Sequence, residues 1–291
     1  MRDLSKIARK SGALAMVAVD QREALRGMFA ANQTGPIPDS QLTKFKVDVA
    51  RILTPHASAL LVDQEFGIDS IVNEKAMSSN SGLIAAADLL IGPPGGAATD
   101  TDVDPAVDPI RMKNIGAAGL KFLVLWRKDE SPDHRATLVE KFQKYCELSD
   151  LPSIIEIIVK APNDKSIEFD REEQLIEAAK EAKSWKPDLY KAEVPFHGQG
   201  DLDLIKKNAS RISEVIEGPW VVLSNGVKQE YFAEAVKACC QGGASGFLAG
   251  RAVWADIVNS PDIPKALTEV SIPRLEKLSE IVDTYAKPWN S

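Results

Sequence analysis

Eight short apolar runs, each ending in a polar or glycine-bearing turn, limit the possible folds of this chain more than any other feature. Segments with helical periodicity, such as REEQLIEAAKEAKSW, lie between most of these runs, so a strand–helix unit of roughly 30 residues repeats along the chain. This repeat predicts a single (β/α)8 TIM barrel of the α/β class over residues 1–291. The runs cover residues 13–20, 58–63, 82–88, 119–126, 153–159, 188–194, 220–226 and 245–251.

A doubly wound open sheet is the main alternative, because it also alternates strands and helices. Such a sheet carries a glycine-rich turn after its first strand, whereas DQREA follows the first run of this chain. Two irregular segments are expected within the barrel. They are an extra turn around ANQTGPIPDS at 31–40 and an irregular loop at IGPPGGAATDTDVDP, 91–105.

Composition and charge exclude several classes of partner. The chain has a formal net charge of −7 and no dense stripe of Lys and Arg, which argues against nucleic acid and anionic membranes as ligands. No apolar run approaches the length of a membrane span. The basic and apolar N-terminal segment ends at Asp20 without a cleavage pattern, so it predicts a short helix and then a strand rather than a signal peptide.

Cysteine and histidine are both scarce. The three cysteines include an adjacent pair and predict no disulfide framework, which fits a reducing cytoplasm. The three histidines are isolated, so neither a histidine-rich metal site nor a metal cofactor is expected. These residues are Cys146, Cys239, Cys240, His56, His134 and His197.

Charged residues occur inside the predicted strands. Side chains alternate along a barrel strand, and function lies at the carboxyl ends of the strands. In DLYKAEV this alternation directs Lys191 and Glu193 into the barrel, and on two other strands it directs Lys121 and Glu156 to the same interior. Two carboxylates that end the first two strands are expected nearby, Asp20 and Asp63.

This convergence suggests amine chemistry. A lysine that is partly desolvated and close to another cation has a lowered pKa, so its neutral amine can attack a ketone and form a Schiff base. Lys191 would be the nucleophile, Glu156 would transfer protons, and Lys121 would promote deprotonation of Lys191 and hold a substrate hydroxyl. The alternative is that these lysines and carboxylates form structural ion pairs.

The loops after the last two strands, LSNGV and FLAGRAVW, predict a phosphate site. In barrels of this kind glycine amides in these two loops approach the anion. The alternative is that the glycines only serve tight turns. The expected phosphate ligands are Ser224, Asn225, Gly226, Gly250 and Arg251.

Several segments resemble the sulfofructosephosphate aldolases, class I aldolases of sulfoquinovose breakdown that belong with the tagatose-bisphosphate aldolases. The resemblance covers about residues 11–285. It implies a (β/α)8 fold and a metal-independent cleavage of 6-deoxy-6-sulfofructose 1-phosphate to dihydroxyacetone phosphate and 3-sulfolactaldehyde. The matching segments include AVDQREALRGMFA, LKFLVLWRKDE, SIIE, DLYKAEVP, PWVVLSNGV and GASGFLAGRAVWA.

The resemblance also implies roles for individual residues. The Schiff-base lysine falls on Lys191, the proton-transferring glutamate on Glu156, and the supporting lysine on Lys121. The family's Asp-Gln pair and phosphate-loop arginine fall on Asp20, Gln21 and Arg251. Two departures lie at the mouth of the expected pocket: FHGQGD carries His197 in place of a tyrosine, and SNG replaces SSG. We expect His197 to be a loop residue rather than a catalyst.

The group at the far end of the substrate is the open question. A sulfonate carries one negative charge and a phosphate about two, so a sulfonate pocket needs fewer cations. DQRE and LWR resemble the sulfosugar enzymes more than the bisphosphate enzymes. Four residues just past strand ends are candidates to contact this group, the alternative being solvated loop residues or local salt bridges: Gln21, Arg22, Gln64 and Arg127.

Other functions stay open at this stage. A tagatose- or fructose-bisphosphate aldolase and a transaldolase would use the same lysine chemistry, whereas a noncatalytic phosphosugar-binding barrel would bind ligand without a covalent step. An interior nucleophilic lysine favours an enzyme. The expected partner is a small ketose phosphate, and a cytoplasmic homo-oligomer is expected.

Overall fold

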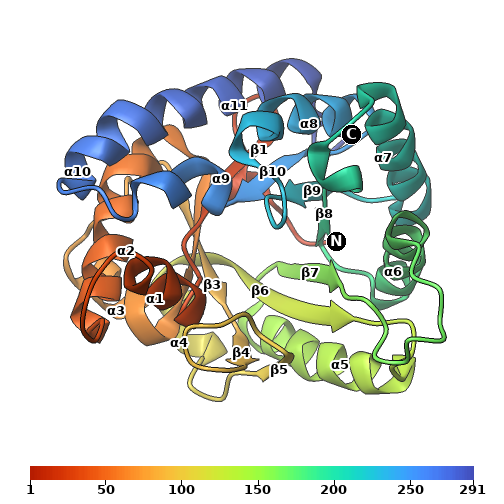
Figure 1. Ribbon diagram of the computed structural model, residues 1–291, viewed down its shortest axis with the longest axis horizontal. Coiled ribbons are helices and arrows are strands. Elements are labelled where there is room, and N and C mark those ends of the chain that lie inside the picture. Colours follow the sequence, from red (N-terminus) through yellow and green to blue (C-terminus); the bar gives the residue numbers. More distant parts are fainter.

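The computed structural model describes residues 1–291 and contains a closed barrel of eight parallel strands (Figure 1). The order around the barrel is β1, β2, β3, β6, β7, β8, β9 and β10, and β10 pairs with β1 to close it. Each strand overlaps one of the eight apolar runs, so the predicted (β/α)8 barrel is confirmed. The strands are Leu14–Ala18, Ala59–Asp63, Gly82–Ala86, Ala117–Trp126, Ser153–Val159, Leu189–Glu193, Trp220–Leu223 and Gly246–Ala249.

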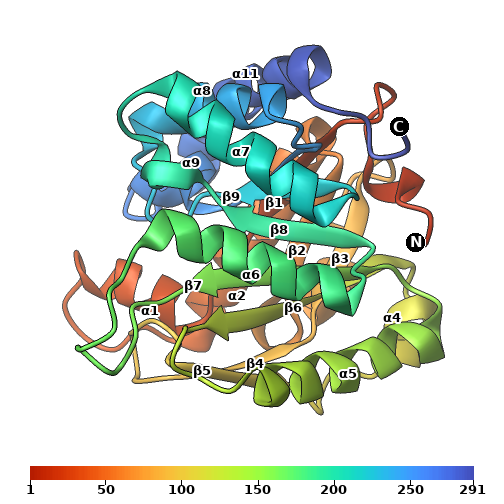
Figure 2. The same ribbon diagram turned by 90° about the vertical axis from the view of Figure 1, so that its right-hand side faces the viewer.

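Helices connect the strands and cover the outside of the barrel, where α5, α6 and α7 lie side by side (Figure 2). Asp170 and Asp201 accept hydrogen bonds from first-turn amides of α6 and α7, which fixes where those helices begin. No helix in the chain has the length and apolar character needed to span a bilayer. The helices are α1 Glu23–Ala30, α2 Asp39–Leu53, α3 Asp69–Asn73, α4 Pro109–Asn114, α5 Pro132–Ser149, α6 Arg171–Trp185, α7 Leu202–Ile216, α8 Gln229–Gln241, α9 Arg251–Trp254, α10 Ile263–Ala266 and α11 Ile272–Tyr285.

The strands carry two apolar clusters, one on each face. On β8, Tyr190 and Ala192 point outward into the large cluster between barrel and helices, while Leu189 belongs to the smaller cluster inside the barrel. Lys191 and Glu193 follow Leu189 on the inner face and are buried. The alternation predicted from DLYKAEV is therefore confirmed, and it places charged side chains at the carboxyl end of the interior.

The segment after β3 differs from the prediction. Instead of an irregular loop, residues from 88 to 103 contain an antiparallel hairpin of β4 (Asp88–Ile91) and β5 (Asp100–Val103). The second strand, DTDV, contains two aspartates, and aspartate is depleted in strands, so its local sequence gives no strand signal. The hairpin matters for the site because three of its residues, Leu90, Ala97 and Ala98, line the cavity described next.

Candidate active site

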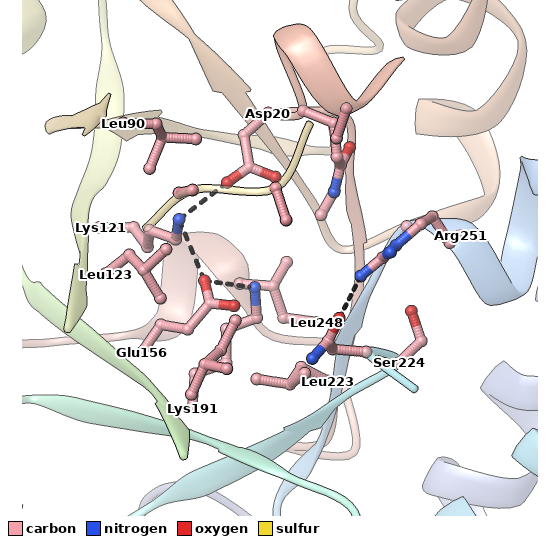
Figure 3. A pocket seen from close by; sticks show the side chains of 18 of the residues that line it. Asp20, Leu90, Lys121, Leu123, Glu156, Lys191, Leu223, Ser224, Leu248 and Arg251 are labelled. Carbon is pink, nitrogen blue, oxygen red and sulfur yellow. Dashed lines mark hydrogen bonds and ion pairs between the residues drawn. The ribbon is translucent and has the colours of Figure 1, made fainter. Parts of the chain in front are cut away.

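A cavity of about 150 Å³ lies at the carboxyl ends of the barrel strands (Figure 3). Leucines form much of its apolar wall, among them Leu90 of the hairpin, Leu123 of β6 and Leu248 of β10. Charged side chains from several strands meet in it: Asp20, Lys121, Glu156, Lys160, Lys191 and Arg251. The cavity therefore lies where the barrel fold predicts function.

Lys191 and Glu156 form a buried pair in this cavity. The two residues are register partners on β8 and β7, so the alternation of both strands directs them inward at the same level. Lys191 Nζ donates to Glu156 Oε2 at 2.9 Å, and only 5% and 8% of the two side chains are exposed. Burial alone would raise the pKa of Glu156, but the charges of Lys121 and Lys191 outweigh it and lower that pKa. Glu156 is thus an ionised carboxylate within hydrogen-bond reach of the Lys191 amine.

Lys121 lies among three carboxylates. Its Nζ is 2.8 Å from Asp20 Oδ2, 2.8 Å from Asp88 Oδ2 and 3.0 Å from Glu156 Oε2. Burial would lower the pKa of Lys121, yet the three carboxylates together raise it well above the ordinary lysine value. In return, Lys121 and Lys191 hold the pKa of the buried Asp20 below its usual range, against the effect of desolvation. Lys121 is therefore a fixed cation rather than an amine ready for attack.

Asp88 belongs to this network although sequence reasoning did not select it. Besides Lys121, its Oδ2 accepts the backbone N–H of Leu123 at 3.1 Å. The signal was present: the first three barrel strands lead into VAVD, LLVD and AAAD, each with an aspartate at the carboxyl end. Only the first two of these aspartates were singled out.

Asp63, expected beside Lys121, lies elsewhere. It pairs with Lys46 of α2, whose fully buried Nζ also donates to the carbonyls of Val19 and Gln21, each at 2.8 Å. Burial lowers the pKa of Lys46. Lys46 was missed because it lies in a polar-looking helix, although Leu42, four residues earlier, belongs to the buried face of the same helix. Its hydrogen bonds hold the turn that carries Asp20.

The predicted phosphate residues fall into two groups. Ser224, Asn225, Gly250 and Arg251 line the cavity, and Figure 3 shows Ser224 and Arg251 on one side of it. The Arg251 guanidinium donates to the Asn225 side-chain oxygen. Gly226 lies outside the cavity wall. Its φ of +73° and its approach to the His197 ring require glycine, so its place in the structure fits the turn that was the alternative.

Of the four residues predicted to contact the far end of the substrate, one lines the cavity and three do not. Gln21 lines the cavity, and its buried Oε1 has no hydrogen-bond partner. The other three lie outside the wall in local interactions, the alternative that the sequence left open. These interactions are Arg22 with Asp88 at 3.5 Å, Gln64 with Arg111 at 2.7 Å, and Arg127 with Glu130 at 2.7 Å.

Lys160 lines the cavity and was not predicted. The available signal was the alternation of β7, because Ile154 and Glu156 face inward and continuing in steps of two reaches Ile158 and Lys160. The apolar run itself ends at Val159, one residue before Lys160.

His197 lies in the loop after β8, outside the cavity wall. It and Phe196 adopt positive φ angles of 50° and 54°, which is uncommon for residues other than glycine. Burial lowers the pKa of His197. All three cysteines are free thiols, and no group of three or more His, Cys, Asp or Glu side chains is arranged to hold a metal ion.

Comparison with known proteins identifies the family. Residues 14–256 match the family of DeoC/LacD aldolases. The chain is a DeoC/LacD family aldolase. It is 27% identical to tagatose 1,6-diphosphate aldolase 2 of Enterococcus faecalis, over 99% of this chain and 95% of the relative. It is 30% identical to tagatose 1,6-diphosphate aldolase 1 of the same species, over 87% of this chain and 83% of the relative.

Solved structures share the fold of this aldolase. Fructose-bisphosphate aldolase from Plasmodium falciparum superposes with a TM-score of 0.71 at 14% identity, over 98% of this chain and 94% of the other. An archaeal fructose-1,6-bisphosphate aldolase, solved with its catalytic lysine bound to a carbinolamine intermediate, gives a TM-score of 0.61 at 15% identity, over 95% of this chain and 96% of the other. The family match and the tagatose 1,6-diphosphate aldolase relatives confirm the predicted aldolase, a lyase of the class I family, and the solved structures confirm its fold. The sulfonated substrate is a proposal.

Proposed function

We propose that Lys191 forms a Schiff base with a ketose 1-phosphate and that the substrate is 6-deoxy-6-sulfofructose 1-phosphate, which is cleaved to dihydroxyacetone phosphate and 3-sulfolactaldehyde. The observation that carries the mechanism is the 2.9 Å contact between Lys191 Nζ and Glu156 on the cavity wall. Lys121 is the less suitable nucleophile, because three carboxylates hold its positive charge. Lys191 has one carboxylate partner, and that partner can take its proton.

Schiff-base formation begins with transfer of a proton from Lys191 to Glu156. The neutral amine attacks the substrate C2 carbonyl and forms a carbinolamine. Glu156 then returns a proton to the carbinolamine hydroxyl, which leaves as water and gives a protonated imine. The buried pair thus supplies both the nucleophile and the acid for this half of the reaction.

Carbon–carbon cleavage follows from the positive charge on the imine. Glu156, again a carboxylate, removes the proton from the C4 hydroxyl, and the C3–C4 bonding electrons move into the imine to give an enamine. The aldehyde leaves. Protonation of the enamine at C3 and addition of water release dihydroxyacetone phosphate and restore the lysine, so the water lost earlier is regained.

The other residues of the cavity wall position the substrate. Asp20 and Asp88 each accept a hydrogen bond from Lys121 at 2.8 Å and hold it in place, which leaves its third N–H for a substrate hydroxyl. Arg251, with Ser224 and the backbone at Gly250, is placed to bind the C1 phosphate, because a planar guanidinium can contact two phosphate oxygens at once.

The sulfonated substrate is supported by the sequence resemblance and by Gln21 of DQRE, which lines the cavity, whereas Arg22 and Arg127 lie outside its wall. A tagatose- or fructose-bisphosphate aldolase is the second candidate, favoured by the names of the relatives. Measurement of kcat/KM for 6-deoxy-6-sulfofructose 1-phosphate, tagatose 1,6-bisphosphate and fructose 1,6-bisphosphate separates the two. The proposal requires the highest value for the sulfonate, and a higher value for either bisphosphate would reject it. A noncatalytic barrel would cleave none of them.

A further inference from the structure

The cavity has two regions that differ in charge pairing. We call Asp20, Lys121, Glu156 and Lys191 the floor, and Lys160 and Arg251 the mouth. In the floor every cation contacts a carboxylate within 3.0 Å. Neither mouth cation forms a salt bridge, and Lys160 Nζ has no hydrogen-bond partner at all. The cavity therefore presents two uncompensated positive charges to a ligand.

The two mouth cations lie on different sides of Lys191. Lys160 follows β7 and Arg251 follows β10, with β8 and β9 between them in the barrel. The Lys160 N–H donates to the Trp126 carbonyl at 2.8 Å, which continues the pairing of β6 and β7 and fixes where Lys160 leaves the strand. A substrate bound to Lys191 and held by Arg251 at one end can thus extend toward Lys160 at the other.

The wall around Lys160 offers no second cation. Ile158 precedes Lys160 by two residues on the same face, and the register partner of Ile158 is Leu125, so both cavity-lining neighbours are apolar. The nearby cations that follow β6 are already paired, Arg127 with Glu130 at 2.7 Å and Lys128 with Glu177 at 3.3 Å. An anion at this end of the cavity meets one free positive charge.

We propose that Lys160 binds the anionic group at the aldehyde end of the substrate and that its single charge favours a monoanion over a dianion. This inference rests on the proposed aldolase function. One ammonium neutralises a sulfonate, whereas a phosphate monoester carries up to two charges above its second pKa of about 6 and leaves one uncompensated beside apolar side chains. Lys160 thus anchors either anion, and the lack of a second free cation beside it favours a sulfonated ketose phosphate over a ketose bisphosphate.

The test compares Lys160→Met with Lys165→Met. Lys165 is exposed, lies in the same loop and does not line the cavity, so it is a matched control. Lys160→Met should lower kcat/KM for 6-deoxy-6-sulfofructose 1-phosphate about 10- to 100-fold, mainly through KM, because a hydrogen-bonded charge is lost. Its effect on fructose 1,6-bisphosphate should be at least as large, because a dianion loses more attraction to the removed charge than a monoanion does. Lys160→Arg should retain most of the wild-type value. Lys165→Met should match wild type.

Borohydride trapping of dihydroxyacetone phosphate keeps this inference separate from the proposed function. That ligand lacks the far end, so Lys160→Met should trap it as wild type does. Failure of the wild-type protein to trap it would remove the aldolase mechanism itself. With trapping intact, an unchanged kcat/KM in Lys160→Met would overturn the anion site. A wild-type kcat/KM as high for fructose 1,6-bisphosphate as for the sulfonate would overturn the preference for a monoanion.

Discussion

The floor and the mouth of the cavity both contain two cationic side chains, but only the cations of the floor contact carboxylates. In the floor, Lys121 and Lys191 contact Asp20 and Glu156, and all four side chains are buried. In the mouth, Lys160 and Arg251 are partly exposed and have no carboxylate partner. Paired charges hold a geometry and let protons move between neighbours, whereas unpaired charges attract an anion. The difference supports the proposal that the floor carries out the chemistry and the mouth binds the anionic ends of the substrate.

A second buried lysine shows why burial alone does not identify a nucleophile. Lys46 is fully buried, like Lys191, but its ammonium contacts the carbonyls of Val19 and Gln21 and the carboxylate of Asp63. Those three acceptors use all of its N–H donors. It does not line the cavity, so no ligand can reach it. Lys191 differs by having a single partner and a place on the cavity wall.

The largest effect is expected from Lys191→Met in the floor. Removal of the nucleophile should lower the rate of cleavage by about 10⁴-fold or more. The barrel should stay folded, because Glu156 keeps its 3.0 Å contact with Lys121. Steady-state kinetics and circular dichroism check the two parts. Near wild-type cleavage by the pure variant would show that the floor does not supply the nucleophile.

Lys46→Met tests whether the second buried lysine is structural. Breaking this pair leaves the buried Asp63 with Arg22, 4.0 Å away, as its remaining cationic partner, which should lower the free energy of unfolding by about 3 kcal/mol in urea titration. The double variant Lys46→Met/Asp63→Asn should lose less, because no ion is left unpaired. A single variant as stable as wild type would contradict the structural role.

Arg251→Ala should weaken the mouth without disabling the floor. Loss of one such contact typically costs about 2 to 5 kcal/mol, or about 30-fold to several thousand-fold in affinity. The binding of dihydroxyacetone phosphate and of the ketose should fall together, and Arg251→Lys should recover only part of the loss. If calorimetry showed unchanged affinity for dihydroxyacetone phosphate, the arginine would belong to the aldehyde end and the orientation would be reversed.

The smallest expected effect is a loss of unfolding free energy at acid pH, which comes from the carboxylates of the floor and not from the mouth. The folded pKa values of Asp20 and Glu156 are lowered, so their contribution to stability is present above the unfolded values of about 4 and is lost as pH falls below them. Unfolding free energies at pH 7, 5 and 3 should therefore be similar at the first two and lower at the third. Arg251→Ala should show the same acid dependence, and a stability that rises toward pH 3 would contradict the charge assignment of the floor.

The sequence predicted what depends on local periodicity. Alternation along each strand was enough to direct Lys121, Glu156 and Lys191 inward, and the structure brings them together. Alternation does not identify which charged side chains pair with each other, because the contacts of Asp20 with Lys121 and of Lys46 with Asp63 join residues far apart in the chain. These pairs depend on how the barrel closes and on how α2 packs against it.

The dependence of contacts on the fold also explains why three residues predicted to bind substrate lie outside the cavity. Arg22, Gln64 and Arg127 follow strands, as functional residues do, but their neighbours include groups that already satisfy them. Lys160 has no such neighbour. A charged residue at a strand end can be recognised from sequence, whereas its freedom to bind a ligand is set by the fold.

Borohydride reduction in the presence of dihydroxyacetone phosphate, followed by peptide mass mapping, tests the central claim most directly. The imine predicted on Lys191 becomes a stable secondary amine, so the adduct should map to the peptide containing DLYKAEVP and be absent from Lys191→Met. An adduct on Lys121 or Lys46, or no adduct in the wild-type protein, would contradict the assignment of Lys191 as the nucleophile.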